Sequence, residues 1–364
     1  MDQRIDGFHD PALCRSLVGA IRERLAGRRL RFMEVCGTHT VAIFRSGIRS
    51  VLADVVDHLS GPGCPVCVTH DREVAAFLDL ASRPNVTVAT FGDLMRVPGP
   101  GGRSLKAAQA EGARVKIVYS PADALEWAAS HPEEQVVFLG VGFETTAPAV
   151  AATLQMAKAR EIMNFSVLSM HKLVPPALAA LAADPDISLD AFLLPGHVSA
   201  IIGTEPYQFL ATEHGIPSVV AGFEPVDVLD AIKTLAEMTA SGTARVENCY
   251  RRVVADAGNP RAMAILHEVF AVTDAPWRGI GVIPRSGLAL RPEYAPWDAR
   301  VVFAVEEQDV PPIPGCRCGE VLKGKLAPDG CPLFGRACTP AAPVGPCMVS
   351  TEGSCAAYFK YRVR

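Results

Sequence analysis

The sequence predicts an α/β protein with two similar doubly wound parallel-sheet lobes that face a cleft, followed by a cysteine-rich C-terminal domain. Two observations predict this class. Short β-rich runs alternate with helical patterns over most of the chain, and six of the eleven cysteines fall in a Gly- and Pro-rich stretch that begins at Cys316. The alternation favours parallel strands joined by crossover helices, whereas the tail has too few aliphatic residues to fold by burial alone.

Eight apolar, β-branched runs are the expected strands, four in each lobe. The first lobe, residues 28–132, takes 31–35, 55–59, 86–91 and 115–119, and the second, residues 133–242, takes 136–141, 165–169, 191–194 and 218–221. Helices are expected at 123–130, 147–160, 176–183 and 226–240. Residues 243–364, with or without 1–27, then form a third domain that holds the cysteine tail.

Composition and charge exclude several functional classes. A net charge of −4 gives no reason to expect nucleic acid or an anionic membrane as a partner. The start lacks the apolar stretch of a signal peptide, and no run reaches the roughly 18 apolar residues of a membrane span. We therefore expect a cytoplasmic protein with reduced thiols, in which Cys14 and Cys249 are small buried residues.

Five motif-bearing loops follow predicted strands. They are residues 36–40, 61–67, 142–146, 195–199 and 222–225. Since ligands of doubly wound sheets bind outside the carboxyl ends of the strands, we expect all five loops to line one cleft between the lobes.

Cys36 is the candidate thiolate of this cleft. It stands where a strand ends and a helix begins near Thr38, so the positive helix end is expected to lower the thiol pKa. His39 is close enough in sequence to offer a polar contact or a proton. The alternative is that Thr38 caps the helix while Cys36 packs beneath it.

Cys64 and Cys67 form a CxxC pair. This spacing permits either half of a metal site or a reversible disulfide. The preceding residues 61–63, Gly-Pro-Gly, are expected to form an exposed rigid turn, which favours dithiol and disulfide exchange.

Acidic and imidazole side chains complete the candidate cleft. Glu144 and Glu224 both follow Gly-Phe at predicted strand ends, where they act either as helix N-terminal charges or as a matched pair in the cleft. His197 and His171 stand at similar positions, although either alone is more often a structural residue.

The tail offers four thiolates for a metal site. Cys316, Cys331, Cys338 and Cys355 are the expected ligands, because this set leaves Cys318 and Cys347 as one surplus pair. A four-iron four-sulfur (4Fe-4S) cluster and a structural zinc both take four thiolates, so spacing alone leaves the two open.

The motifs together resemble the HypD family of hydrogenase maturation proteins. The resemblance rests on residues 36–40 (CGTHT), 61–67 (GPGCPVC), 142–146 (GFETT), 195–199 (PGHVS) and the six-cysteine tail, and it spans about 32–361. It implies a scaffold for the iron centre of nickel-iron hydrogenases, on which an iron with two cyanides and one carbon monoxide is assembled before transfer to the hydrogenase large subunit.

The resemblance also implies partners and residue roles. The partners are a HypC-type chaperone and a HypE-type protein that donates cyanide from a thiocyanate. Cys36 holds the iron together with the chaperone's N-terminal cysteine, and Cys64 and Cys67 are the exchange pair. The tail carries a 4Fe-4S cluster beside a dithiol, similar to ferredoxin-thioredoxin reductase; the family leaves open which four cysteines are ligands.

Two other functions fit the same residues. One is an iron-sulfur disulfide reductase of the ferredoxin-thioredoxin type, whose client is a separate protein. The other is a zinc-stabilised binding module without redox chemistry, which predicts a colourless protein.

Overall fold

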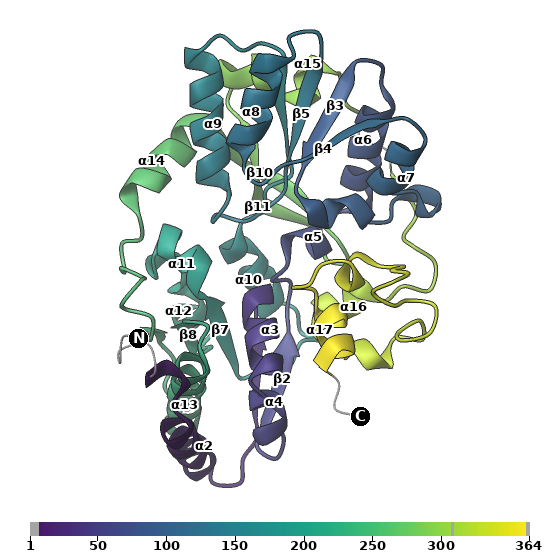
Figure 1. Cartoon of the computed structure of the whole chain (residues 1–364). Coiled ribbons are helices and arrows are strands. Elements are labelled where there is room, and N and C mark those ends of the chain that lie inside the picture. Colours follow the sequence, from purple (N-terminus) through teal and green to yellow (C-terminus); the bar gives the residue numbers. More distant parts are fainter. Residues whose placement is uncertain (1–6, 307–308, 362–364) are drawn as a thin grey trace.

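A computed structural model of the chain describes residues 7–306 and 309–361. Two parallel sheets form two lobes, an antiparallel hairpin lies against one of them, and the C-terminal segment lies beside both (Figure 1). The predicted α/β class with two parallel sheets is confirmed. Within the described residues, no helix has the length and apolar character needed to cross a membrane.

The first sheet has five parallel strands in the order β2-β1-β7-β8-β9. The strands are β1 (Leu30–Glu34), β2 (Val56–Ser60), β7 (Ala191–Pro195), β8 (Ser218–Ala221) and β9 (Val246–Asn248). The helices packed around this sheet are α2 (Pro11–Leu25), α3 (Gly37–Arg45), α4 (Ile48–Val51), α11 (Gly196–Ile202) and α13 (Pro225–Ser241). Strands β7 and β8 are buried along their whole length, as expected where helices cover both faces of a parallel sheet.

The second sheet has four parallel strands in the order β4-β3-β5-β6. The strands are β3 (Val86–Thr90), β4 (Arg114–Ile117), β5 (Gln135–Gly140) and β6 (Phe165–Ser169). The helices of this lobe are α6 (Asp71–Ser82), α7 (Leu105–Ala110), α8 (Pro121–Ser130) and α9 (Ala147–Ala159). Helix α6 covers β3, and α8 covers β5.

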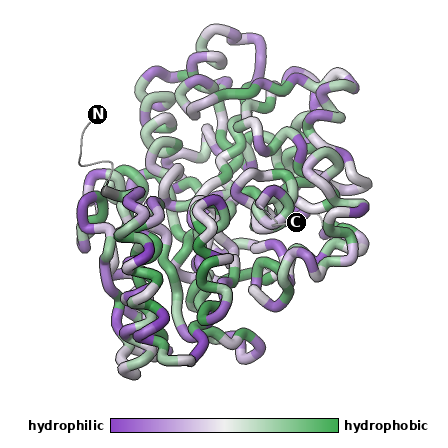
Figure 2. Tube along the Cα trace, turned by 60° about the horizontal axis from the view of Figure 1, so that its bottom comes forward, coloured by the Kyte–Doolittle hydropathy of each residue, from purple (hydrophilic) through white to green (hydrophobic). Residues whose placement is uncertain are grey.

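Connecting elements complete the two lobes. They are α5 (Pro65–Val68), α10 (Val174–Ala182), α12 (Phe209–Thr212), α14 (Pro260–Val269) and α15 (Ala299–Val302). Short 3-10 helices are found at Gly7–His9, Gly92–Arg96, Pro100–Gly102, Glu205–Tyr207 and Pro292–Trp297. Among the described residues the outer helices of Figure 2 alternate between hydrophilic and hydrophobic residues, as expected of helices with one buried face.

The expected grouping of the strands is wrong. The lobes are not strands one to four and five to eight, because the chain leaves the first sheet after β2, builds the whole second sheet, and returns to the first with β7. The boundary between residues 132 and 133 therefore cuts through the second sheet. Hydrophobic runs predict strands but carry no information on which strands pair, because pairing is decided by long-range packing.

The segment after residue 242 is not all one unit. Strand β9 joins the first sheet, and an antiparallel hairpin of β10 (Phe270–Trp277) and β11 (Gly281–Leu290), which the sequence pattern did not predict, packs on α10 and β6. The remaining tail, 309–361, has helices α16 (Cys318–Leu322) and α17 (Ser354–Tyr361) and 3-10 turns η6 (Pro328–Gly330) and η7 (Pro346–Met348).

The tail contacts both lobes. Helix α17 packs on α3, and η7 packs on α5. Arg96, in the loop after β3, donates from Nη1 to the Pro340 carbonyl oxygen at 3.0 Å, while Lys325 forms ion pairs with Asp184 (3.0 Å) and Asp186 (2.9 Å). One apolar core extends through both sheets and the tail, so the tail is fixed over the junction of the lobes.

Candidate functional site

Each sheet has one point where the strand order reverses. In the five-stranded sheet this point lies between β1 and β7, and in the four-stranded sheet it lies between β3 and β5. Cys36 lies in the loop after β1, His197 lies in the first turn of α11, which follows β7 directly, and Glu144 lies in the loop after β5. Because ligands of open α/β sheets bind where strand order reverses, the topology selects these loops as the candidate site.

Cys36 is the N-cap residue of α3, and a neighbouring glycine loop packs against it. Its backbone is extended, with φ of −150° and ψ of 118°, and the Gly37 amide donates to the Gly63 carbonyl at 2.9 Å. A Cβ atom on Gly63 would lie 2.1 Å from the Cys36 amide nitrogen. Only glycine therefore allows the CxxC loop to approach the Cys36 loop this closely.

The expected low pKa of Cys36 is wrong. Cys36 is buried, and burial raises the pKa of its thiol to about 12, with the charges of Glu34 and Glu352 acting in the same direction. The backbone N–H groups of His39 and Thr38 favour the thiolate, but they make no capping hydrogen bond of normal geometry. Desolvation of the sulfur thus outweighs the helix N-terminus.

A fully buried carboxylate lies beneath Cys36. Glu34 Oε2 accepts the Cys36 N–H at 2.9 Å, and Oε1 accepts the Thr40 hydroxyl. His58 Nε2 lies 3.6 Å from Glu34 Oε1, beyond hydrogen-bond distance. Glu34 therefore fixes the backbone of the Cys36 loop from inside the lobe.

His39 and His197 both pack their rings against Phe223. The ring centroids of His39 and Phe223 are 4.6 Å apart, and those of His197 and Phe223 are 4.1 Å apart. His39 Nε2 donates to the Gly222 carbonyl at 2.9 Å, and burial lowers the pKa of His39 to about 4. His39 is thus a neutral imidazole whose Nδ1 has no hydrogen-bond partner among the described residues.

Glu144 and Glu224 are not a matched pair. Glu144 is buried, its Oε1 accepts the Val174 N–H at 2.9 Å, and burial raises its pKa to about 7. Glu224 is half-exposed, caps α13 and pairs with His9 at 2.7 Å. Burial raises the pKa of Tyr207 well above its ordinary value, and the charges of Glu144 and Cys36 act in the same direction.

His171 is held by the hairpin rather than by the Cys36 loop. Ser169 Oγ donates to the Leu288 carbonyl at 2.7 Å and lies 3.0 Å from His171 Nδ1. Because the single hydroxyl proton is used, His171 Nδ1 must donate to Ser169. Burial lowers the pKa of His171 to about 3, which fits a neutral structural histidine.

Cys64 and Cys67 are buried, so the expected exposed turn is wrong. Their exposed fractions are 4% and 0%, and the Cys67 N–H donates to Cys64 Sγ at 3.3 Å. The pKa of Cys67 is well above its ordinary value, chiefly because of burial. The Gly-Pro-Gly turn serves close packing against β1 and the Cys36 loop.

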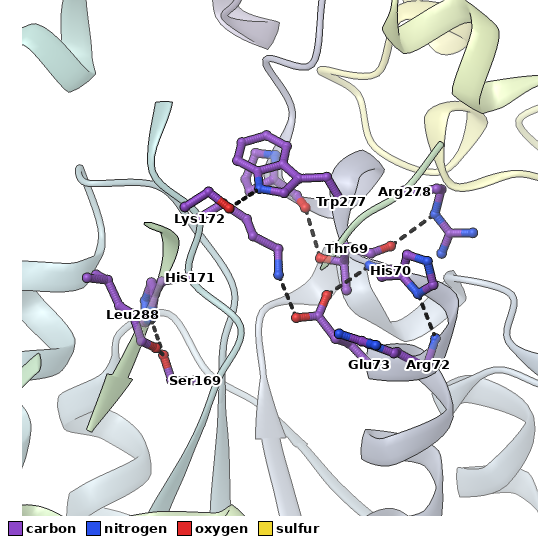
Figure 3. Close-up of polar contacts among 12 residues, drawn as sticks. Thr69, His70, Arg72, Glu73, Ser169, His171, Lys172, Trp277, Arg278 and Leu288 are labelled. Carbon is purple, nitrogen blue, oxygen red and sulfur yellow. Dashed lines mark hydrogen bonds and ion pairs between the residues drawn. The ribbon is translucent and has the colours of Figure 1, made fainter. Parts of the chain in front are cut away.

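Buried ionic contacts hold the helix that follows the CxxC pair (Figure 3). Lys172 Nζ lies 2.5 Å from Glu73 Oε1, with both side chains 2% exposed, and joins the loop after β6 to the start of α6. Arg278, at the end of β10, donates to the Thr69 carbonyl at 2.9 Å and pairs with Asp71. The CxxC segment is therefore fixed to the second lobe and to the hairpin.

The CxxC pair and the tail thiols are connected. Cys67 Sγ donates to the carbonyl oxygen of Pro346, the residue before Cys347, at 4.0 Å, and η7, which holds Cys347, packs on α5. Cys318 Sγ lies 3.2 Å from Cys316 Sγ. The CxxC pair therefore lies beside the tail segment that holds Cys347, and Cys318 lies beside Cys316.

The tail cysteines line one cavity. Five of them face it, with Val321, Leu333, Phe334 and Met348 among the other walls; the five are Cys316, Cys318, Cys331, Cys338 and Cys355. A Cβ atom on Gly345 would lie 2.6 Å from Cys316 Sγ and 2.7 Å from Cys318 Sγ, so glycine leaves these sulfurs their space. The donor set is thiol-only in an apolar surrounding, which suits an iron-sulfur cluster.

The thiols are not arranged around an ion. Among the described residues, no group of three or more His, Cys, Asp or Glu side chains has a geometry that could hold a metal ion. All eleven cysteines are free thiols. Cys14 and Cys249 are half-buried rather than buried, and they pack at the edge of the five-stranded sheet core.

Sequence reasoning missed Glu34, Phe223, Tyr207 and Glu352. Glu34 was visible as the carboxylate within the expected strand 31–35, and Phe223 stood within the Gly-Phe-Glu pattern that drew attention to Glu224. Glu352, which accepts the Thr38 hydroxyl at 2.8 Å, and Tyr207 gave no signal, because their contacts join distant parts of the chain.

Known proteins resemble the chain over its whole length. A family model, HypD, described as "Hydrogenase formation hypA family", matches residues 12–362. The chain is 48% identical over 365 residues to the hydrogenase maturation factor HypD of Escherichia coli (strain K12), covering 98% of each chain. It is 44% identical to HypD of Cupriavidus necator and 44% identical to HypD2 of Bradyrhizobium diazoefficiens, covering 98% of this chain and 96% of each relative. The chain therefore belongs to the HypD family.

Proposed function

We propose that this chain is a scaffold and redox protein in nickel-iron hydrogenase maturation, and that it holds the iron to which two cyanides and one carbon monoxide are attached. The position of Cys36 is the main support for this proposal, because Cys36 lies where the strand order of the first sheet reverses and beside the CxxC loop. The names of the relatives support a role in hydrogenase maturation. Thiolate is a suitable ligand for this iron, which is the cargo of the protein.

Burial of Cys36 has a chemical consequence. A thiol with a pKa of about 12 stays protonated at neutral pH, so iron binding releases its proton and the metal replaces the missing stabilisation of the thiolate. In the free protein Cys36 is then protected from oxidation and from other electrophiles.

We propose that the tail holds a 4Fe-4S cluster through Cys316, Cys331, Cys338 and Cys355. All four side chains line the thiol cavity, and Cys347 does not. Cys318 lines it as well, with its Sγ 3.2 Å from Cys316 Sγ, and we group it with Cys347 as the dithiol beside the cluster. When bound, the cluster supplies single electrons.

The two dithiols form a proposed relay beside the cargo. Reduction of a Cys64–Cys67 disulfide takes two electrons and two protons and returns both thiols. The contact of Cys67 Sγ with the carbonyl oxygen of Pro346, at 4.0 Å and next to Cys347, supports a second dithiol, Cys318 and Cys347, beside the first. A HypC-type chaperone and a HypE-type cyanide donor are the proposed partners, in the cytoplasm, and the hydrogenase large subunit receives the iron from the chaperone complex.

A disulfide reductase acting on a separate protein is the second candidate. The connected thiols favour it, since they resemble a reductase relay. The burial of Cys64 and Cys67 opposes it, because a client disulfide needs access to the attacking sulfur. The scaffold function needs no such access.

The decisive experiment compares Cys36→Ser with a matched variant, Cys14→Ser, whose thiol lies outside the site. Both are purified anaerobically with the chaperone and examined by infrared and visible spectroscopy. We expect Cys36→Ser to keep its fold and its cluster absorbance but to lose the cyanide and carbonyl bands, while Cys14→Ser keeps them. Bands of full intensity in Cys36→Ser place the iron on other ligands, and Cys64→Ser is then the variant to examine.

A further inference from the structure

A groove runs along the open edge of the five-stranded sheet. Strand β2 is the last strand on its side of the sheet, and all five of its residues line a groove of about 490 Å³. The opposite wall comes from the cysteine tail, with Val321, Leu326, Pro328 and Tyr358 among its residues. The groove contains neither Cys36 nor any cysteine of the proposed relay, although it shares Val321 with the thiol cavity and includes His58, the neighbour of Glu34.

The backbone of β2 offers unpaired hydrogen-bonding groups to this groove. The Leu30 amide donates to the Val55 carbonyl, and the Gly61 amide donates to the Glu34 carbonyl. In a parallel pair alternate residues face the neighbour, so Val55, residues 57 and 59, and Gly61 face β1. The N–H and C=O groups of His58 and Ser60 consequently face the groove, and no described residue bonds to them.

Exposed edge strands are usually blocked by charge, proline or a bulge, whereas this one is recessed behind the tail wall. A recessed edge with unused donors and acceptors fits the addition of one strand.

The charge of the groove selects the kind of strand. Three arginines line it, namely Arg29, Arg31 and Arg49, against one carboxylate, Asp57. Arg29 is bound to Asp57, and Arg31 lies 3.9 Å from it. The Arg49 guanidinium stacks over Phe44 and Tyr358 and has no carboxylate partner among the described residues.

We propose that this groove binds an extended acidic segment of a partner protein, which pairs as an added strand with β2 and places its carboxylates on Arg31 and Arg49. A second copy of this chain does not fit, since pairing two β2 edges would bring the arginines of both copies together. The chain's own last residues, Arg362, Val363 and Arg364, carry the wrong charge. The proposal does not depend on the proposed function, because it involves no thiol and no metal.

The probe is a fluorescently labelled hexapeptide of alternating glutamate and valine, titrated into the full-length protein at low salt. We expect saturable binding that weakens as salt is added, because the charges are partly exposed. Arg31→Gln and Arg49→Gln should each weaken binding about threefold. The matched control is Arg28→Gln, an exposed arginine outside the groove, which should bind as the unchanged protein does.

Backbone pairing is tested with two N-methylated peptides, one methylated on the valines and the other on the glutamates. In an added strand only alternate amides face the sheet, so one isomer should lose at least about tenfold in affinity and the other should keep it. Equal binding of both isomers, equal binding of a lysine-valine peptide, or no binding of the acidic peptide would overturn the proposal.

Two further outcomes identify another occupant and likewise overturn it. A chain ended at residue 361 that binds the peptide at least fivefold more tightly would mean that the C-terminal residues occupy the groove. A dimer in sedimentation that dissociates on addition of the peptide would mean that a second copy does.

Discussion

Cys36 combines a ligand atom with surroundings that favour its protonated form. The sulfur is buried beside two carboxylates, Glu34 and Glu352, and the helix N-terminus does not offset them. A residue arranged in this way reacts with a metal that replaces its proton and resists other reagents. Glu144 shows the same effect of burial on a carboxyl group, and its titration can be followed directly.

Glu144→Gln should change how stability depends on pH. Burial raises the Glu144 pKa from 4.5 to about 7, so the folded protein binds this proton more tightly than the unfolded chain. The stabilisation is complete below about pH 4.5 and is lost as pH rises through 7, a change of roughly 3 kcal/mol. We expect urea unfolding at pH 5 and pH 8 to show that Glu144→Gln raises the free energy of unfolding, relative to the unchanged protein, more at pH 8 than at pH 5.

The control for this measurement is Glu23→Gln. Glu23 is an exposed residue of α2, and its variant should follow the pH dependence of the unchanged protein. An identical pH dependence in Glu144→Gln and the unchanged protein would mean that Glu144 is ionised in the fold.

At the scale of elements, two short segments decide where the thiols stand. The turn before the CxxC pair packs on the Cys36 loop through Gly63, and α6 fixes the other end of the CxxC segment through Glu73. Each contact joins segments that are distant in the sequence. Both therefore depend on how the chain passes from one sheet to the other.

Gly63→Ala should displace the Cys36 loop. The added Cβ would lie 2.1 Å from the Cys36 amide nitrogen. The nearest atoms belong to the backbone of Val35 and Cys36, so the clash can be relieved only by moving the backbone. We expect a loss of about 2 kcal/mol or more in the free energy of unfolding, together with faster alkylation of Cys36. Gly19→Ala is the control: Gly19 lies within α2 with no atom near its Cβ position, and alanine there should stabilise the protein by up to about 1 kcal/mol.

Lys172→Met should leave the Glu73 carboxylate buried without its cation. The expected loss is about 3–5 kcal/mol in urea unfolding, and the double variant Lys172→Met/Glu73→Gln should recover most of it. Glutamine keeps an acceptor for the His70 amide, which Glu73 Oε2 accepts at 2.8 Å. The surface pair Arg245 and Glu247 provides the contrast, since Arg245→Met should change stability by less than about 1 kcal/mol. The expectation would be contradicted if Lys172→Met were as stable as the double variant Lys172→Met/Glu73→Gln.

At the scale of the whole molecule, the tail lies over the junction of the two lobes. It contacts α3 and α5 and reaches the loop after β3 through Arg96. Its short helices and 3-10 turns contribute little regular structure of their own, so its order rests on those contacts and, in our proposal, on the cluster.

Removal of iron by chelation should loosen the tail selectively. A local loss of about 1.4 kcal/mol raises the open fraction about tenfold, and trypsin cleavage at Arg317, Lys323 and Lys325 should accelerate by at least that factor. Cleavage after Lys158 in α9 should not change, and mass spectrometry distinguishes the sites. Equal cleavage rates with and without iron would mean that the order of the tail does not depend on a cluster.

The sequence by itself determined strands β1 to β8, the loops at their carboxyl ends and the thiol-rich tail, because periodicity and local composition carry these signals. It placed Cys36, His39 and the CxxC pair on neighbouring loops, and the structure brings these loops together. Only the tertiary structure decided which strands share a sheet, and therefore where the strand order reverses. It also decided the burial of Cys36 and Cys67, and hence the direction of their pKa shifts, because desolvation depends on residues far away in the chain.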